Sequence, residues 1–135
     1  MISEQETSRV IAYEGNGGGV GDPTRRACKF MIVQHAGVSS LVYGPVETFR
    51  YHALLLDRYC RDQNVASGWV KRPELLDILD GSVVLRGGGW MELDYGLSRL
   101  RFHGISTAYG GFDRILLTRI LDAAGAFPGY RVTVD

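Results

Sequence analysis

Four residues in this chain have side chains suited to binding or transferring an anionic group. His52 opens the apolar run "HALLLDRYC", and Lys29, one of only two lysines, opens the run "CKFMIVQH". Ser106 and Thr107 stand in "GISTAYGG", just before another apolar periodic segment. Two of these positions are expected helix starts, which offer unpaired backbone N–H groups and the positive end of a helix dipole. The sequence therefore predicts an anion site, and phosphate is a ligand that such sites bind readily.

Each of these residues also has an ordinary structural interpretation. A histidine at a helix start often caps the helix or borders a core, and a serine or threonine there is usually an N-cap. A lysine at the start of a strand is usually solvated. The functional alternative is phosphoryl transfer without a metal, in which imidazole carries a proton near neutral pH and lysine supplies a point charge. The residue types alone leave both interpretations open.

Two segments have the spacing of amphipathic helices that would position these residues. The first is predicted over 46–63, where apolar residues recur at i, i+4, i+7 and i+11, namely Phe49, Ala53, Leu56 and Cys60. The second is predicted over 112–124, with one apolar face formed by Phe112, Ile115, Leu116, Ile120 and Leu121. The segment "PELLDILD", 73–80, predicts a short third helix with proline at its first position.

Runs of β-branched, aromatic and alternating residues predict the strands. They fall at 9–13, 28–35, 40–44, 82–86, 90–96, 97–106 and 130–135, with a bulge or bend where three glycines, 87–89, separate two of them. The runs 82–86 and 90–96 count as one strand if it continues through the glycines, and the run 9–13 is short, so we expect five or six strands. With two main helices they indicate an α/β sandwich, in which one mixed sheet is flanked by the helices. We expect "FMIV" and "RVTV" to lie in that one sheet.

Length and composition fit a single domain over 1–135, with the first 27 residues partly flexible because of the glycine-rich stretch "GNGGGVGDPTRR". That stretch lacks the Gly-Lys-Ser/Thr ending of a P-loop. The formal net charge is zero, which argues against nucleic acid or an anionic membrane as a partner. Two isolated cysteines form neither a zinc pattern nor a disulfide framework, and no stretch reads as a signal peptide or membrane span. These features predict a cytoplasmic protein with no metal.

Four motifs, quoted in chain order, together resemble the Janus/Ocnus family, which includes phosphohistidine phosphatases. They are "YHALLLDRY", "VLRGGGWMEL", "FHGISTAYG" and "PGYRVTVD", and the resemblance covers 28–62 and 83–135. It implies a sheet flanked by two helices and metal-independent hydrolysis of the P–N bond of phosphohistidine, with no cofactor. The expected substrate is a phosphohistidine-containing protein or a small phosphoramidate.

The resemblance also assigns site residues. His52 matches the family's catalytic histidine, as general base or as nucleophile, and Lys29 matches a lysine that contacts phosphate. The remaining substrate-binding residues that it implies are Tyr51, Ala53, Ser106, Thr107 and Ala108. By contrast, His35 and His103 match no functional position and are expected to be structural or surface residues.

The chain departs from the family at several positions. Leu54 stands where an acid is expected, and Tyr43 lies near the position of an arginine. In the phosphate loop Thr107 replaces a methionine and Ile105 an aromatic residue, while 64–81 has the character of an insertion. The second hypothesis is accordingly a non-catalytic module that binds phosphate or a phosphoprotein through the same groups. Either protein would be a monomer or a weak homodimer.

Overall fold

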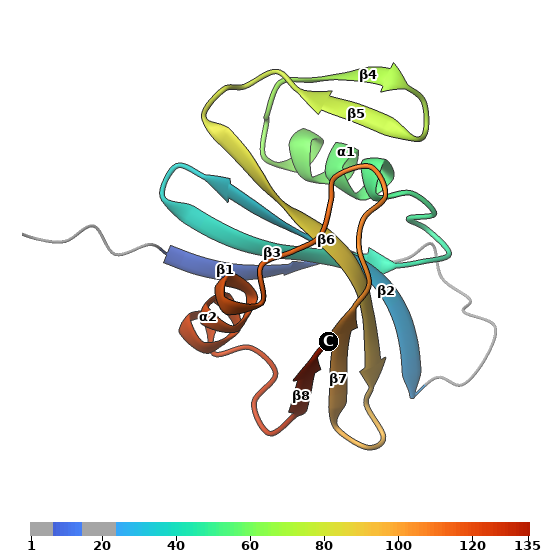
Figure 1. The fold of residues 1–135 in the computed structure, drawn as a ribbon, viewed down its shortest axis with the longest axis vertical. Coiled ribbons are helices and arrows are strands. Elements are labelled where there is room, and N and C mark those ends of the chain that lie inside the picture. Colours follow the sequence, from blue (N-terminus) through green and yellow to red (C-terminus); the bar gives the residue numbers. More distant parts are fainter. Residues whose placement is uncertain (1–6, 15–23) are drawn as a thin grey trace, which may run out of the picture.

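The computed structural model describes residues 7–14 and 24–135, which form a six-stranded sheet, a small two-stranded sheet and two helices (Figure 1). The large sheet has the order β1-β3-β2-β6-β7-β8. Its members are β1 (Thr7–Ala12), β2 (Arg25–His35), β3 (Val38–Pro45), β6 (Val83–Asp94), β7 (Arg99–His103) and β8 (Arg131–Val134). The outer pairs β1–β3 and β7–β8 are parallel and the inner pairs antiparallel. The predicted class, a mixed sheet flanked by two helices, is confirmed, and "FMIV" and "RVTV" lie in one sheet.

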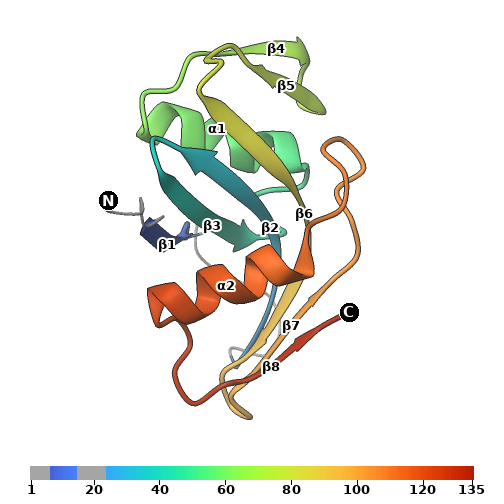
Figure 2. The same ribbon diagram turned by 60° about the vertical axis from the view of Figure 1, so that its left-hand side comes forward.

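The sheet separates two apolar cores because successive side chains of a strand point to opposite faces. On β2, Met31 and Val33 pack with the helix α1 (His52–Asp62), whereas Phe30 and Ile32 pack with α2 (Arg114–Ala124). The two helices thus cover different faces, as the turned view in Figure 2 makes clear. The continuous apolar run of β2 is explained by this burial on both sides.

Helix α1 begins at His52, six residues later than its predicted start. The preceding residues form a turn in which the amides of Thr48 and Phe49 both donate to the carbonyl of Pro45. Tyr51 then has an extended backbone and acts as the N-cap. Phe49 belongs to the apolar stripe as predicted, but it reaches the core from this turn, with its ring packed against the backbone of Gly44. Periodicity alone does not distinguish a turn from the first turn of a helix when both bury the same face.

Helix α2 agrees with its predicted range within two residues, but the predicted apolar face is partly wrong. Leu117, Ile120 and Leu121 are buried, whereas Ile115 is 72% exposed. Three successive apolar residues, 115–117, cannot all face the sheet, and docking against β1 and β3 selects Leu117. Asp113 caps the helix by accepting hydrogen bonds from the amides of Ile115 and Leu116.

The short helix predicted at 73–80 is absent, and the chain forms a strand there instead. The small sheet consists of β4 (Ser67–Lys71) and β5 (Leu75–Ile78), paired antiparallel in a hairpin that lies over α1 (Figure 1). Leu76 is buried in the α1 core. A helix of this length has little stability on its own. Pairing with 67–71 instead satisfies the backbone hydrogen-bonding groups of the segment and places Leu76 in the core. The predicted insertion at 64–81 corresponds largely to this hairpin.

The glycines at 87–89 do not end a strand, as the sequence suggested, because β6 runs through them unbroken. The predicted irregularity is present as a register shift opposite β2 between Met31 and Val33. A β-carbon on Gly88 would lie 2.3 Å from the carbonyl oxygen of Phe30, and one on Gly89 would lie 2.6 Å from that of His103. Glycine is required because neighbouring backbone approaches β6 too closely for any side chain.

Several expectations lie wholly or partly outside the described residues. The glycine-rich stretch falls mostly within 15–23, and the predicted flexibility of the first 27 residues concerns these and 1–6. Within the described parts, no helix combines the length and apolar character needed to cross a membrane. Cys28 and Cys60 are buried free thiols, and burial raises their pKa values to about 12 and about 11, respectively.

Candidate active site

Lys29 lies on β2 directly opposite Trp90 of β6, on the face of the sheet that carries α1. The side chain is 6% exposed, and its ammonium donates a hydrogen bond to the backbone carbonyl of Arg50. The rings of Trp90 and Tyr51 lie with their centroids 5.1 and 5.8 Å from Nζ. Aromatic faces attract a cation, so these contacts hold the ammonium in one place. Burial lowers the pKa of Lys29.

His52 is the first residue of α1, and its ring is directed at β6. Its Nε2 lies 3.0 Å from the carbonyl oxygen of Gly89. A carbonyl only accepts, so Nε2 carries the hydrogen and Nδ1 carries the lone pair. Burial lowers the pKa of His52, the nearby carbonyls of Gly89 and Phe30 oppose that effect, and the charge of Lys29 reinforces it. The result is an imidazole that is neutral at physiological pH and has a defined tautomer.

The start of α1 has no side-chain cap. Tyr51 occupies the N-cap position, but its side chain accepts no hydrogen bond from the first turn. The amide of Leu54 donates to the carbonyl of Tyr51, whereas the amides of His52 and Ala53 come before the first acceptor that the helix itself provides. These two amides add partial positive charge beside His52. Since Lys29 is held by the same segment through the carbonyl of Arg50, cation and helix start form one electropositive unit.

The loop between β7 and α2 supplies the opposite wall of the site. The amide of Ser106 donates to the carbonyl of Gly88 and the amide of Gly88 to that of Gly110, which fixes the loop across β6. Ser106 itself is 1% exposed, and its hydroxyl accepts a hydrogen bond from the amide of Tyr109. Thr107 and Ala108, at the tip, are exposed. Ser106 thus shapes the loop, and its neighbours face outward.

These elements enclose a cavity of about 510 Å³. Five of the seven residues proposed from the sequence line it, namely Lys29, Tyr51, His52, Thr107 and Ala108. The other two lie behind it: Ser106 is buried in its loop, and Ala53 is buried in the core beneath α1. The structure therefore brings together the two segments that the sequence placed more than fifty residues apart.

Four further residues line the cavity that the sequence analysis did not propose as site residues: Arg50, Glu74, Trp90 and Ile105. Arg50 precedes Tyr51 and adds a second cationic side chain to the pocket. Trp90 lies in the cavity because β6 pairs with β2, and no local sequence pattern reveals that pairing. Glu74 comes from the β4–β5 hairpin and forms an ion pair of 3.0 Å with Lys71. The hairpin, which the sequence analysis left without a role, thus supplies one wall of the cavity.

The second helix start does not contribute to the cavity, contrary to expectation. The carboxylate of Asp113 occupies the amides at the start of α2, and these residues border a separate hollow with Arg86 and Arg119. A carboxylate already bound at a helix start leaves no place there for phosphate. The anion site depends instead on α1 and on the loop tip.

The remaining histidines lie outside the cavity lining. His35 is 3.9 Å from Asp80 at the far end of β2, and His103 is 3.5 Å from Glu92. Within 7–14 and 24–135, no three His, Cys, Asp or Glu side chains are grouped to hold a metal ion.

Comparison with models of known protein families gives no match, and comparison with curated protein sequences gives none either. The resemblance to the Janus/Ocnus family therefore stays a prediction.

Proposed function

We propose that this protein is a metal-independent phosphatase that hydrolyses the P–N bond of phosphohistidine, in a protein or in a small phosphoramidate. The observation that carries the proposal is the neutral His52 ring, whose Nε2 is bound to the Gly89 carbonyl. Its proton-accepting Nδ1 belongs to a ring that lines a cavity together with a buried lysine. The motifs shared with the Janus/Ocnus family support the same reaction.

Binding of the phosphoryl group follows from the donors at the cavity. Lys29 supplies positive charge, the first amides of α1 supply directed N–H groups, and the hydroxyl of Thr107 is available at the loop tip. Preorganised donors of this kind stabilise the charge that develops on phosphoryl oxygens in the transition state. Arg50, at the rim, adds long-range attraction for a dianion.

His52 carries the proton in the proposed reaction. As a general base, Nδ1 takes a proton from water while the water oxygen attacks phosphorus. The resulting imidazolium returns that proton to the departing nitrogen, so water is added across the P–N bond. As a nucleophile, Nδ1 attacks phosphorus while the substrate P–N bond breaks, and the departing nitrogen takes a proton from solvent. Water then hydrolyses the transient phosphohistidine, which releases phosphate and restores the neutral ring. Both routes begin from the same neutral tautomer.

The test is incubation of purified protein with phosphohistidine and with phosphoramidate in excess chelator, with phosphate release as the measurement. Release at an undiminished rate supports the proposal. Activity that disappears with chelator and returns with added metal would contradict the metal-free mechanism.

Binding without turnover would instead favour the second hypothesis, a module that holds phosphate or a phosphoprotein through Lys29 and the loop tip. Isothermal titration with inorganic phosphate and with a phosphohistidine peptide measures that binding independently of catalysis. We place the protein in the reducing cytoplasm, because Cys28 and Cys60 are both unpaired thiols.

A further inference from the structure

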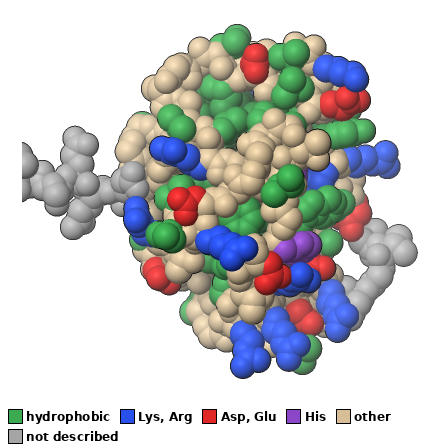
Figure 3. Space-filling model, in the orientation of Figure 1, with side chains coloured by type: hydrophobic (Ala, Val, Ile, Leu, Met, Phe, Trp, Pro, Cys, Tyr) green, Lys and Arg blue, Asp and Glu red, His purple; other side chains and the backbone are tan. Residues whose placement is uncertain are grey.

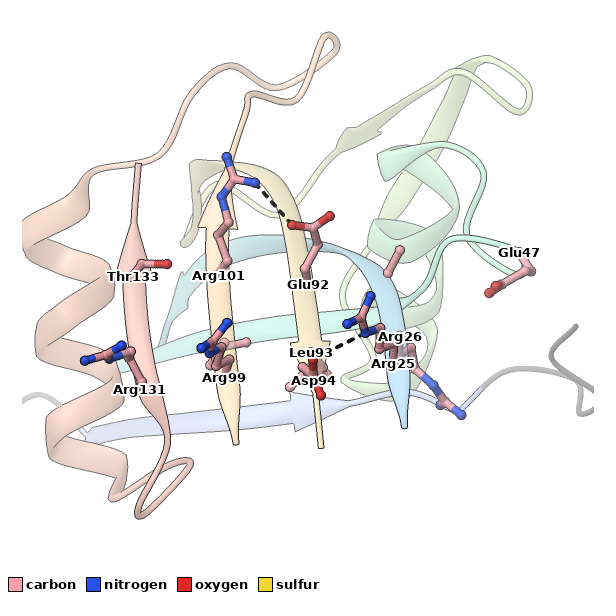
Figure 4. A pocket seen from close by; sticks show the side chains of 12 residues that line it. Arg25, Arg26, Glu47, Glu92, Leu93, Asp94, Arg99, Arg101, Arg131 and Thr133 are labelled. Carbon is pink, nitrogen blue, oxygen red and sulfur yellow. Dashed lines mark hydrogen bonds and ion pairs between the residues drawn. The ribbon is translucent and has the colours of Figure 1, made fainter. Parts of the chain in front are cut away.

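At the end of the large sheet that lies lowest in Figure 1, one face has no helix or hairpin packed on it within residues 7–14 and 24–135. The residues Ala27, Glu92, Arg101 and Thr133 form one row across β2, β6, β7 and β8, and Arg25, Asp94, Arg99 and Arg131 form the next. Figure 4 shows both rows from nearby. The alternate residues, among them Met91, Leu100 and Phe102, are buried against α2 on the opposite face. The two rows therefore form an open sheet face rather than part of a core.

This face is hollowed and rich in arginine. A depression of about 700 Å³ is lined by five arginines and three carboxylates, together with four other residues. Figure 3 shows basic side chains gathered over this lower end of the molecule. The face is thus basic although the whole chain has no net charge.

Arg99 and Arg131 are two neighbouring positive charges on the face. They are direct partners on the parallel strands β7 and β8, so their side chains project side by side. Like charges placed opposite one another destabilise a sheet. Ion pairs hold Arg25 to Asp94 and Arg101 to Glu92 and Asp135, but within the described residues no ion pair relieves Arg99 or Arg131. A carboxylate from another molecule between these two guanidinium groups would remove the repulsion.

The face continues into the proposed active site. Lys29 and Trp90 line the catalytic cavity, and on the same strands Ala27 and Glu92, two residues away, belong to the basic face. From the Lys29 row to the Arg25 row there are four residues along β2, or roughly 13 Å at about 3.3 Å per residue. Trp90, which also lines the cavity, is four residues from Asp94 along β6, and Arg99 and Arg131 lie one and two strands across from Asp94 at about 4.8 Å per strand. The diagonal distances from Trp90 are roughly 14 and 16 Å. An extended peptide with its phosphorylated residue in the cavity would therefore bring side chains about four and five positions away over Arg99 and Arg131.

We propose that this open sheet face docks an extended acidic segment of the phosphorylated protein substrate, with carboxylates about four to five residues from the phosphohistidine. The inference rests on the proposed function for the identity of that phosphorylated residue. A peptide suits the face better than a nucleic acid does, because Glu47, Glu92 and Asp94 lie among the arginines. A continuous phosphate backbone would meet these carboxylates, whereas a peptide with a few acidic side chains can avoid them.

The experiment uses fluorescent peptides that carry a non-hydrolysable phosphonate analogue of phosphohistidine. Two glutamates stand about four and five positions away on either side, and matched peptides carry glutamine or lysine there. Anisotropy gives Kd for the wild type, for Arg99→Glu combined with Arg131→Glu, and for the control Arg114→Glu combined with Arg119→Glu. The control makes the same change of charge at exposed positions on α2, which covers the opposite face.

We expect the wild type and the control to bind the glutamate peptide roughly three- to tenfold more tightly than the glutamine peptide, as a few exposed ion pairs allow. The preference should weaken with salt, and the Arg99/Arg131 variant should lose it or prefer lysine. Phosphoramidate is too small to reach the face, so its rate of hydrolysis by the Arg99/Arg131 variant should differ from that of the wild type by less than about twofold. Surface substitutions usually change stability little, which is the reason for this bound.

The two proposals fail in different ways. If the protein hydrolyses phosphoramidate but shows no preference for acidic peptides, the docking proposal is contradicted and the phosphatase proposal is still supported. If the protein prefers acidic peptides through Arg99 and Arg131 but hydrolyses no substrate, the docking proposal is supported and the phosphatase proposal is contradicted. Tighter binding of an oligouridine through the same two arginines, or a dimer that the double variant dissociates, would assign the face to RNA or to a second copy of the chain and overturn the proposal.

Discussion

His52 combines a proton-accepting nitrogen with an environment that keeps it unprotonated. The carbonyl of Gly89 orients the ring, and burial and the charge of Lys29 both disfavour imidazolium. Lys29 is buried too, but its contacts are with two aromatic rings and a backbone carbonyl. Replacement of His52 and replacement of Lys29 should therefore affect activity in different ways.

His52→Ala should lower kcat on phosphohistidine by about 10²–10⁴-fold, the usual loss when acid–base catalysis is removed. Alanine is the best helix former, so α1 should persist.

Lys29→Met keeps most of the buried stem but removes the charge, and we expect KM to rise more than kcat falls. Steady-state kinetics with circular dichroism measures both. His35→Ala is the control because His35 lies at the far end of β2; a kcat for His52→Ala near that of the control would leave the imidazole with only a structural role.

The pH dependence should follow the neutral form of His52. Its pKa is lowered from 6.5, so kcat/KM should be level near neutrality and fall only when the pH drops below 6.5 through that lowered pKa. Initial rates between about pH 5 and pH 8, corrected for spontaneous hydrolysis, give the profile, and NMR titration of the imidazole gives the pKa directly. A His52 that titrates above 6.5 would contradict the assigned environment.

The same shift has a consequence for folding. Below pH 6.5 the unfolded chain binds a proton at this site more readily than the folded chain, so protonation favours unfolding. The contribution of His52 to stability is therefore full above 6.5 and decreases as the pH falls towards the folded-state pKa.

At the scale of elements, the site depends on how closely the loop after β7 approaches β6. The glycines of β6 allow the backbone of that loop to hydrogen-bond to Gly88 from both directions. Tyr109 then joins the loop to the hairpin, since its hydroxyl donates to the carbonyl of Leu76 and accepts from the amide of the same residue. Loop, strand and hairpin consequently hold one another in position around the cavity.

Gly88→Ala tests the close approach of β2 to β6, on the other side of the strand that receives the loop. The new methyl group would meet backbone of β2 at 2.3 Å, and overpacking of this kind costs about 1–3 kcal/mol. Gly81→Ala is the matched control, because nothing lies within 4 Å of a β-carbon there. Urea denaturation of both variants measures the free energy of unfolding, and equal stabilities would show that β2 and β6 can separate without cost.

At the scale of the molecule, the two cores share one sheet, and the outlying hairpin shares a core with α1. Trp69 of β4 packs against the same cluster that contains Leu56 and Leu76. The chain has only two tryptophans, so Trp90→Phe leaves Trp69 as a reporter of the hairpin.

We expect a single cooperative transition in urea, with the fluorescence of Trp69 and the circular dichroism of the whole domain giving the same midpoint. The reason is that the hairpin cannot detach without exposing the buried face of α1. An earlier midpoint for Trp69 would identify the hairpin as an independently unfolding unit.

Sequence by itself determined the elements whose patterns are local. The apolar run of β2 and the range of α2 follow from local periodicity. Periodicity also predicted the helix that contains His52, although that helix begins six residues later than predicted. These signals are reliable because each depends on neighbours a few residues away. The mixed sheet between two helices was predicted on that basis.

Tertiary structure alone decided what depends on pairing between distant segments. Residues 75–78 became a strand because β4 and the core above α1 were available to them. Trp90 lines the cavity because the strand register sets it opposite Lys29. Ser106 does not line it, because its hydroxyl accepts a hydrogen bond from the amide of Tyr109 inside its own loop. Register and loop packing are fixed by long-range contacts whose energies no local pattern contains, so only the folded chain reveals which side chains face the cavity.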